Sequence, residues 1–116
     1  ATCEVAPDAV SIVVIPKIDS NNESVYHLYV IQADRRDELL DYLGKNGISA
    51  GIHYPIPVNL QKHFDYLGYG EGSFPVTEKI SKKIISLPMF PELKKEEIEY
   101  VCEKVREFFK KINSKL

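Results

Sequence analysis

Hydrophobic and polar positions recur with two different periods along this chain, and the two periods predict different elements. The clearest pattern lies near the end, where apolar side chains recur at three- and four-residue steps: Ile98, Val101, Cys102, Val105, Phe108 and Ile112. That spacing predicts an amphipathic helix with one buried stripe and a solvated face rich in Lys, Glu and Arg. Lys94 stands at the cap position, where a hydrogen-bond acceptor would suit the helix dipole better, so we expect fraying through Lys95.

A second apolar stripe predicts a helix that starts at Asp34 and closes at Gly47. Asp34 offers the N-cap, and the carboxylates of Asp37 and Glu38 in the first turn complement the helix dipole. The buried stripe consists of Leu39, Leu40 and Leu43. Gly47 can take the left-handed conformation that a position just past a helix end needs. Residues 58–72 predict a short helical or irregular piece that ends in a glycine-rich loop. A third helix is expected from Ser73 and Pro75, with Val76, Ile80 and Ile84 on one side, until residues 86–88 break it.

Three segments favour strands. Residues 10–15 are a β-branched run ended by Pro16, and residues 48–52 are a short apolar run after Gly47. Residues 25–32 alternate with a period of two, and both of their faces are largely apolar or aromatic. A short extended piece over residues 87–93 precedes the last helix.

This order of elements indicates an α+β fold, a two-layer arrangement in which helices cover one face of a small, mostly antiparallel sheet. At 116 residues the chain is expected to form a single domain, residues 1–116. A strand that is apolar on both faces needs a cover on both sides. We therefore expect the isolated chain to self-associate or to expose an apolar patch.

Composition narrows the setting of the protein. The net charge of −2 offers no basic field for nucleic acid or an anionic membrane, and no apolar run approaches the length of about 20 residues that crossing a bilayer needs. Cys3 and Cys102 lie far apart without a CxxC motif or a secretory leader, which favours a reduced, cytoplasmic location. A start at Ala1 with a weakly patterned lead-in is what a processed chain or an excised fragment would show.

The stretch with the most candidate chemistry is residues 51–61, GIHYPIPVNLQ. Pro55 and Pro57 cannot donate ladder hydrogen bonds, so they are expected to end the preceding strand and to place His53 and Tyr54 at its end. The prolines also bias the residues before them toward extended geometry, which would hold these rings on a stiff rim. By spacing alone, the simpler interpretation is that both are partly buried packing groups.

Several motifs in order resemble the C-terminal part of the DegT/DnrJ/EryC1/StrS family. They are VYHLYVI, RDELLDYL, GIHYPIPVNLQ, FPVTEK and SLPMFPEL, within residues 25–109, whereas residues 1–24 are a poorly matched lead-in. Members of that family are pyridoxal-phosphate-dependent aminotransferases that act on nucleotide-linked keto-sugars. The resemblance implies the small C-terminal domain of a fold-type I aminotransferase, which leans on a large cofactor-binding domain in a homodimer.

In the enzymes that this chain resembles, the His-Tyr pair holds the nucleotide sugar, which here implies substrate binding by His53 and Tyr54. Imidazole and phenol suit this role because both donate and accept hydrogen bonds and both offer a ring face. His27 is a weaker candidate, because a packing role in the middle of a strand explains it as well. Asn59 is also weak: the family commonly has His there, and an amide cannot become a cation toward a phosphate.

Catalysis by the chain alone is not expected. Pyridoxal phosphate needs a Schiff-base lysine, an acidic partner for the ring nitrogen and a phosphate cup, and the resemblance assigns all three to the missing large domain. Lys17, Lys45 and the lysines from Lys79 onward stand in surface contexts. The chain is therefore predicted to contribute substrate-anchoring residues to a longer enzyme, which would use the cofactor, an amino donor and a nucleotide sugar, and to be inactive on its own.

The main alternative function is a free-standing, non-catalytic module that binds a small ligand or a protein through the same α+β layers. A zinc site built from His53, His63 and a cysteine has no recognised ligand spacing. The glycines of residues 68–72 lack the Lys-Ser/Thr ending of a phosphate loop, and Cys3 has no basic neighbour to make it reactive.

Overall fold

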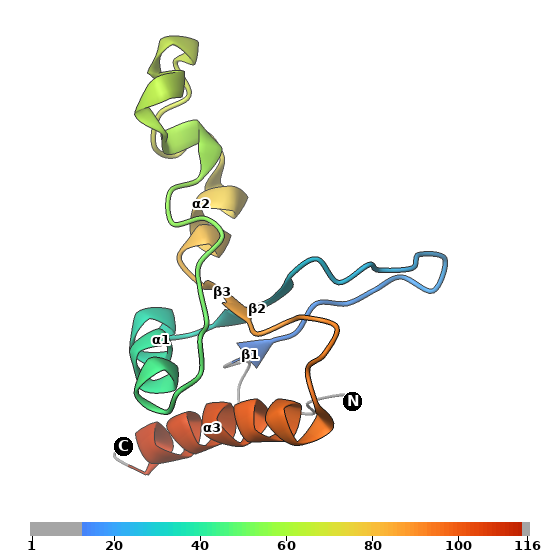
Figure 1. Ribbon diagram of the computed structural model, residues 1–116. Coiled ribbons are helices and arrows are strands. Elements are labelled where there is room, and N and C mark those ends of the chain that lie inside the picture. The colour runs from blue at the N-terminus through green and yellow to red at the C-terminus, as the bar shows by residue number, and fades with distance from the viewer. Residues whose placement is uncertain (1–12, 115–116) are drawn as a thin grey trace.

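The computed structural model describes residues 13–114 and confirms an α+β fold with a three-stranded antiparallel sheet (Figure 1). The strands lie in the order β1-β2-β3. The elements in chain order are β1 (Val13–Val14), β2 (Tyr29–Ala33), α1 (Arg36–Lys45), the 3₁₀ helices η1 (Val58–Leu60) and η2 (Lys62–Leu67), α2 (Pro75–Ser81), β3 (Ile84–Leu87) and α3 (Lys95–Asn113).

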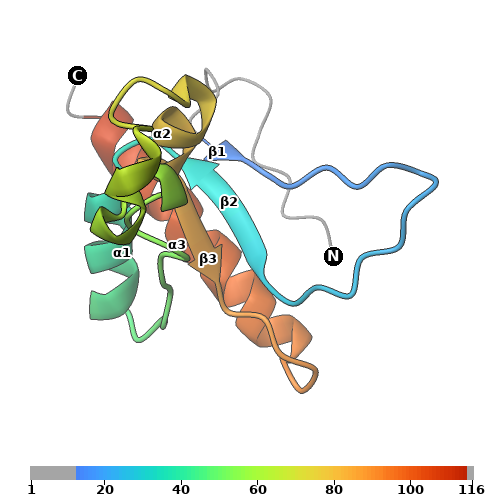
Figure 2. The same cartoon turned by 90° about the horizontal axis from the view of Figure 1, so that it is seen from above.

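The core lies between one face of the sheet, which we call the inner face, and helices α1 and α3. Ile31 of β2 stands opposite Ile85 of β3, and the two side chains are only 2% and 0% exposed. The helices meet them with the predicted stripes, which include Leu39, Leu43, Val101, Val105, Phe108 and Phe109. Figure 2 shows α3 running beneath the sheet. Burial of these apolar side chains is the main stabilising contribution to the fold.

The predicted strand over residues 25–32 is wrong in its first half. Strand β2 begins at Tyr29, and every residue from 14 to 28 is exposed along a connection that projects sideways from the sheet (Figure 1). A proline limits the ladder on the side of β1: by register Pro16 would stand opposite Val30, where its missing N–H would be needed, so β1 cannot extend the sheet toward residue 25. On the other side β3 ends at Leu87, the partner of Tyr29. Of the predicted strand 10–15, residues 10–12 lie outside the described residues.

The predicted strand over residues 48–52 is also wrong, because the segment makes a single bridge, between Gly51 and Ser86. Its first residue is tied to the preceding helix instead, since the Ile48 N–H donates to Leu43 O at 2.9 Å. Gly47 has φ of 76°, which confirms the predicted left-handed turn after α1. The helix does not start at Asp34, whose carboxylate pairs with Lys83 at 2.6 Å.

The third helix ends earlier than predicted. Helix α2 stops at Ser81, and Ile84, which the helical pattern placed on the apolar side, belongs to β3. The Lys83 N–H donates to Ile80 O at 2.8 Å and closes the helix before the strand begins. Together with η1 and η2, which confirm the predicted short helical piece, α2 forms an upright arm over residues 52–82 that rises away from the sheet (Figure 1).

Helix α3 is present as predicted and begins at Lys95. The Glu97 carboxylate accepts a hydrogen bond from the Lys94 N–H at 2.8 Å, which is one half of a capping box. The Lys94 ammonium cannot accept the reciprocal bond, and the Glu97 N–H donates to Lys94 O at 3.1 Å instead. Cys102 is half-buried on this helix, and Cys3 lies outside the described residues. Over residues 13–114, no helix is both long and apolar enough to traverse a lipid bilayer.

Candidate functional site

The outer face of the sheet is the face turned away from α1 and α3. Register places Val30 opposite Ser86 and Gln32 opposite Ile84 on this face, because directly paired residues share one side of a sheet. Ser86 is nonetheless only 4% exposed. The segment after α1 runs beside β3 at the edge of the sheet, where Gly51 exchanges two backbone hydrogen bonds with Ser86, at 3.0 and 2.7 Å. From this crossing point of the two segments, the His53 side chain reaches the Ser86 hydroxyl on the outer face.

His53 is held at this crossing by a side chain from β3. Its Nδ1 lies 2.8 Å from the Ser86 hydroxyl oxygen, within hydrogen-bond distance. The ring folds back over Gly51, where an added Cβ would stand 3.4 Å from the His53 Cε1. His53 is otherwise exposed, and none of the described residues forms a hydrogen bond with its Nε2. One edge of the imidazole is therefore fixed and the other is open.

Tyr54 stands next to it, with 72% of its surface exposed. The two rings meet edge to face, with centroids 5.5 Å apart and an interplanar angle of 80°, and the peptide bond between the residues is cis. No residue within the range 13–114 forms a hydrogen bond with the Tyr54 hydroxyl. Tyr54 is therefore not a partly buried packing group in this chain, whereas His53 packs on Gly51 and contacts Ser86, and the two rings present a donor-acceptor pair to whatever lies above the outer face.

The two weaker candidates lie apart from this pair. His27 is exposed in the connection before β2, so its expected position within a strand is wrong. Asn59 lies in η1, and both polar atoms of its amide are buried without a hydrogen-bond partner among the described residues. No hydrogen bond or ring contact within residues 13–114 joins either residue to His53. A buried amide without a partner is unfavourable, and because both atoms are covered by this chain itself, Asn59 is not open to a ligand in this arrangement.

Ser86 is the residue that sequence reasoning missed. Its run was interpreted as a helix breaker, and the hydroxyl was assigned no role. The sequence does offer one indication: in residues 84–87 a single polar side chain stands among three apolar ones, just before a proline. If this run is a strand, successive side chains point to opposite faces, and Ser86 lies on the face opposite to Ile85.

The described lysines do not fit a pyridoxal-phosphate site. Five of them form surface ion pairs with carboxylates: Lys45, Lys83, Lys95, Lys104 and Lys111. The other six are exposed. A Schiff-base lysine needs a pocket that favours its neutral amine, and the cofactor phosphate needs hydrogen-bond donors around it. Within residues 13–114, no three His, Cys, Asp or Glu side chains cluster so as to hold a metal ion.

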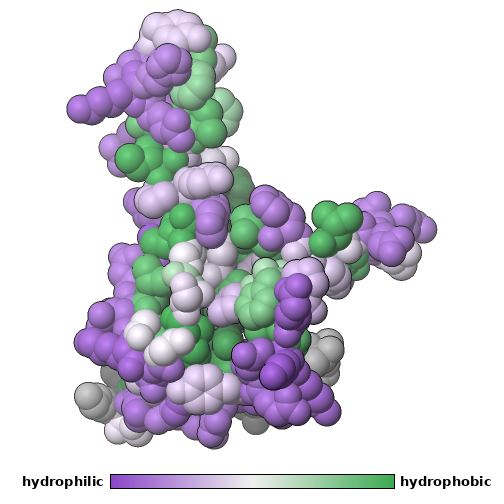
Figure 3. All heavy atoms as spheres, viewed as in Figure 1, coloured by the Kyte–Doolittle hydropathy of each residue, from purple (hydrophilic) through white to green (hydrophobic). Residues whose placement is uncertain are grey.

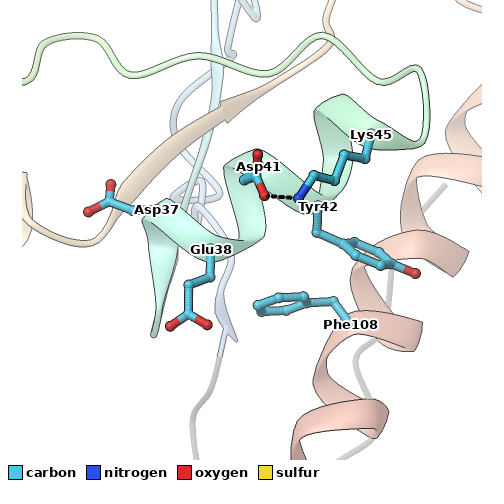
Figure 4. Close-up of a pocket in the computed structure, with 6 residues that line it drawn as sticks. All are labelled: Asp37, Glu38, Asp41, Tyr42, Lys45 and Phe108. Carbon is cyan, nitrogen blue, oxygen red and sulfur yellow. Dashed lines mark hydrogen bonds and ion pairs between the residues drawn. The ribbon is translucent and has the colours of Figure 1, made fainter.

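A shallow hollow of about 450 Å³ lies between α1 and α3, on the opposite side of the sheet from His53 (Figure 4). It is lined by Asp37, Glu38, Asp41, Tyr42, Lys45 and Phe108. The carboxylates are already paired: Asp41 with Lys45 at 2.6 Å, Glu38 with Arg35, and Asp37 with Arg36. Paired and exposed carboxylates leave little charge for a ligand, so this hollow is not the candidate site.

Beside this hollow, one carboxylate ties the two helices together. Glu107 of α3 pairs with Lys104 at 2.8 Å and with Lys111 at 2.7 Å, and the ammonium of Lys111 lies 5.3 Å from the centre of the Tyr42 ring on α1. Hydrogen bonds from Lys104, Lys111 and Tyr42 lower the pKa of Glu107 to about 2. The cluster stabilises the helical layer and lies away from the outer face.

This chain is similar in sequence to parts of longer proteins. A "Pleiotropic regulatory protein" of Geobacillus stearothermophilus is 48% identical over 99 residues, which are 85% of this chain and 27% of that protein. A dTDP-3-amino-3,4,6-trideoxy-α-D-glucose transaminase of Micromonospora megalomicea is 42% identical over 95 residues, 80% of this chain and 25% of that enzyme. The chain thus spans about a quarter of the length of the curated relatives it matches.

Solved structures agree with this comparison. The crystal structure of Streptomyces venezuelae DesV in complex with a ketimine intermediate superposes with a TM-score of 0.76 at 34% identity, over 83% of this chain and 26% of that one. A DegT DnrJ EryC1 StrS aminotransferase from Brucella abortus superposes equally well, at 31% identity over 84% of this chain and 26% of that one. The sequence model of the DegT/DnrJ/EryC1/StrS aminotransferase family matches residues 7–106, and this chain belongs to that family of pyridoxal-phosphate-dependent enzymes.

Proposed function

We propose that this chain is the C-terminal small domain of a longer aminotransferase that acts on a nucleotide-linked keto-sugar. One observation carries the proposal: the family match covers residues 7–106, most of this chain, yet the chain covers only about a quarter of each relative. Several relatives are named as transaminases of dTDP-linked or UDP-linked sugars. The remaining three quarters of such an enzyme would supply the cofactor site, for which the described lysines are unsuited.

Within that enzyme, His53 and Tyr54 anchor the substrate. Both are exposed, both have a polar atom that no described residue engages, and His53 is oriented by Ser86. A fixed ring loses little conformational entropy when it binds, so each hydrogen bond to the sugar nucleotide contributes more to affinity. Asn59 and His27 are secondary candidates: His27 is exposed, whereas the amide of Asn59 is buried and would have to turn outward to reach the substrate.

The outer face of the sheet is where the large domain docks. Val14 is 47% exposed there, and Val30 and Ile84 are half-buried beside it. Figure 3 shows hydrophobic surface in the middle of the molecule and along the upright arm, whereas the rim near α1 and α3 is largely hydrophilic. A large exposed apolar surface is typical of a domain that packs against a neighbour.

The test compares His53→Asn and Tyr54→Phe with His63→Asn and Tyr66→Phe in the full-length protein that carries this chain. The control residues have the same chemistry: His63 makes an edge-to-face contact with Phe64 at 5.2 Å, and Tyr66 is 78% exposed. Loss of one hydrogen bond to an uncharged group should weaken transition-state binding by about 0.5–1.5 kcal/mol and raise KM about 2- to 12-fold. The control variants should leave KM unchanged.

Thermal unfolding of the same four variants separates anchoring from packing. If His53 and Tyr54 anchor substrate, their substitution changes KM while cofactor binding and the melting temperature stay close to those of the unmodified protein. A lower melting temperature with an unchanged KM would overturn the site assignment. A free-standing ligand-binding module would instead show no transaminase activity in the complete gene product.

A further inference from the structure

We propose that Ser86 is a positioning residue that holds His53 as the Nε2–H tautomer, so that His53 donates its hydrogen bond to an acceptor oxygen of the substrate. The inference rests on the proposed anchoring function of His53. It adds a residue to the site that neither the sequence pattern nor the comparisons assign.

The tautomer follows from where the protons can go. Ser86 is only 4% exposed, and among the described residues its hydroxyl forms one hydrogen bond, to His53 Nδ1 at 2.8 Å. If Nδ1 carried the proton and donated to Ser86, the serine hydrogen would be buried without an acceptor. If the hydroxyl donates to Nδ1, every polar hydrogen of the pair is satisfied or open to solvent. The neutral ring then carries its proton on Nε2.

The frame around this hydrogen bond prevents the hydroxyl from moving away. Ser86 pairs with Val30 of β2 on one side, and on the other it exchanges backbone hydrogen bonds with Gly51 at 3.0 and 2.7 Å. The imidazole packs directly over Gly51, where an added Cβ would stand at ordinary contact distance, 3.4 Å, from the His53 Cε1. Ser86 and His53 are 33 residues apart in sequence and meet only through this backbone crossing.

A fixed tautomer sets which substrate group can be bound. An Nε2–H donor binds an acceptor, such as a hydroxyl, carbonyl or phosphate oxygen, and does not bind a group that can only donate. A ring free to exchange tautomers would present the N–H on the open edge for only part of the time. Ser86 therefore increases the fraction of molecules whose His53 is ready to donate.

The deciding measurement is the ¹⁵N chemical shift of the His53 ring nitrogens in the 116-residue chain, at alkaline pH where imidazoles are neutral. The unmodified chain should show Nε2–H almost alone, and Ser86→Ala should show a mixture of tautomers. Ser86→Thr and Ser86→Val form a matched pair, because both are β-branched and differ in the hydroxyl. Thr should keep the single tautomer and Val should lose it. His63, which has no hydrogen bond within the described residues, serves as the internal reference.

Kinetics of the full-length protein test the consequence for substrate. Ser86→Val should raise KM for the nucleotide sugar by up to about 2-fold relative to Ser86→Thr, because a mixture of tautomers lowers the fraction of His53 that is ready to donate by about half, and the difference should vanish when His53 is already Asn. An unchanged tautomer in Ser86→Val and Ser86→Ala overturns the proposal. A changed tautomer with an unchanged KM leaves Ser86 as the residue that orients His53 but removes the substrate-anchoring function, so the two failures are distinguishable.

Discussion

The two faces of the small sheet have opposite characters. On the inner face Ile31, Ala33 and Ile85 are at most 2% exposed and pack against the two long helices. On the outer face the neighbouring residue Ile84 is half-buried, Val14 is 47% exposed, and the surface carries the Ser86–His53 hydrogen bond. The inner face completes a hydrophobic core within the chain. The outer face carries polar groups and incompletely covered apolar side chains.

The difference between the two faces is already present within one short strand, β3. Successive residues of β3 point to opposite faces, so Ile85 and Leu87 contribute to the core while Ile84 and Ser86 face outward. Buried core positions and outward-facing positions therefore alternate along β3, and substitutions at adjacent positions should have separate effects.

The sharpest test of the comparison is Ile85→Ala against Ile84→Ala. Ile85 is fully buried, so its truncation should lower the free energy of unfolding by about 2–5 kcal/mol through lost burial and a residual cavity. Ile84 is half-buried on the outer face, and the same change there should lower it by about 1 kcal/mol or less. Urea unfolding of both variants measures the two values. Equal losses would show that the two faces are equally packed.

A second pair tests the helical layer that covers the inner face. Gly47 has φ of 76°, so Gly47→Ala should lower the free energy of unfolding by about 1–2 kcal/mol. Gly44 lies within α1 with open space around its missing Cβ, so Gly44→Ala should raise it by about 0.5–1 kcal/mol. Thermal unfolding should therefore shift in opposite directions. Stabilisation by both substitutions would contradict the left-handed turn at Gly47.

A third prediction concerns the outer face of the isolated chain. If apolar surface there is left for a missing domain, the chain should associate weakly with itself at high concentration. The double substitution Val30→Lys and Ile84→Lys should then reduce association, because charged side chains oppose burial, while the core on the inner face stays intact. Sedimentation across a concentration series measures this. A strictly monomeric unmodified chain would argue against an incompletely covered face.

The smallest expected effect is on acid stability through Glu107. Its pKa is lowered in the folded chain to about 2 from an ordinary value of 4.5, so its contribution is complete above pH 4.5 and is lost as the pH falls toward 2. Glu107→Gln should flatten the pH dependence of the melting temperature in that interval. Glu103→Gln, at an exposed position of the same helix, is the matched control and should leave the pH profile unchanged.

The sequence predicted correctly those elements whose signal is local. The stripe over residues 98–112 predicted α3, and Leu39, Leu43 and Gly47 predicted α1 and its end, because a helix repeats along its own length and satisfies its own backbone. His53 and Tyr54 were singled out through resemblance to a family, which the comparisons establish. Their anchoring function stays a prediction.

Only the tertiary structure decided the strands and the surroundings of His53. Residues 25–28 and 48–52 have apolar patterns typical of strands, but a strand exists only where a partner backbone is available, and Pro16 and the ends of β3 and α1 removed those partners. Ile84 likewise belongs to β3 and not to the preceding helix, because the backbone of Gln32 in β2 is available as its partner. Ser86 and His53 are 33 residues apart, so their hydrogen bond depends on the crossing of two segments that no local period describes.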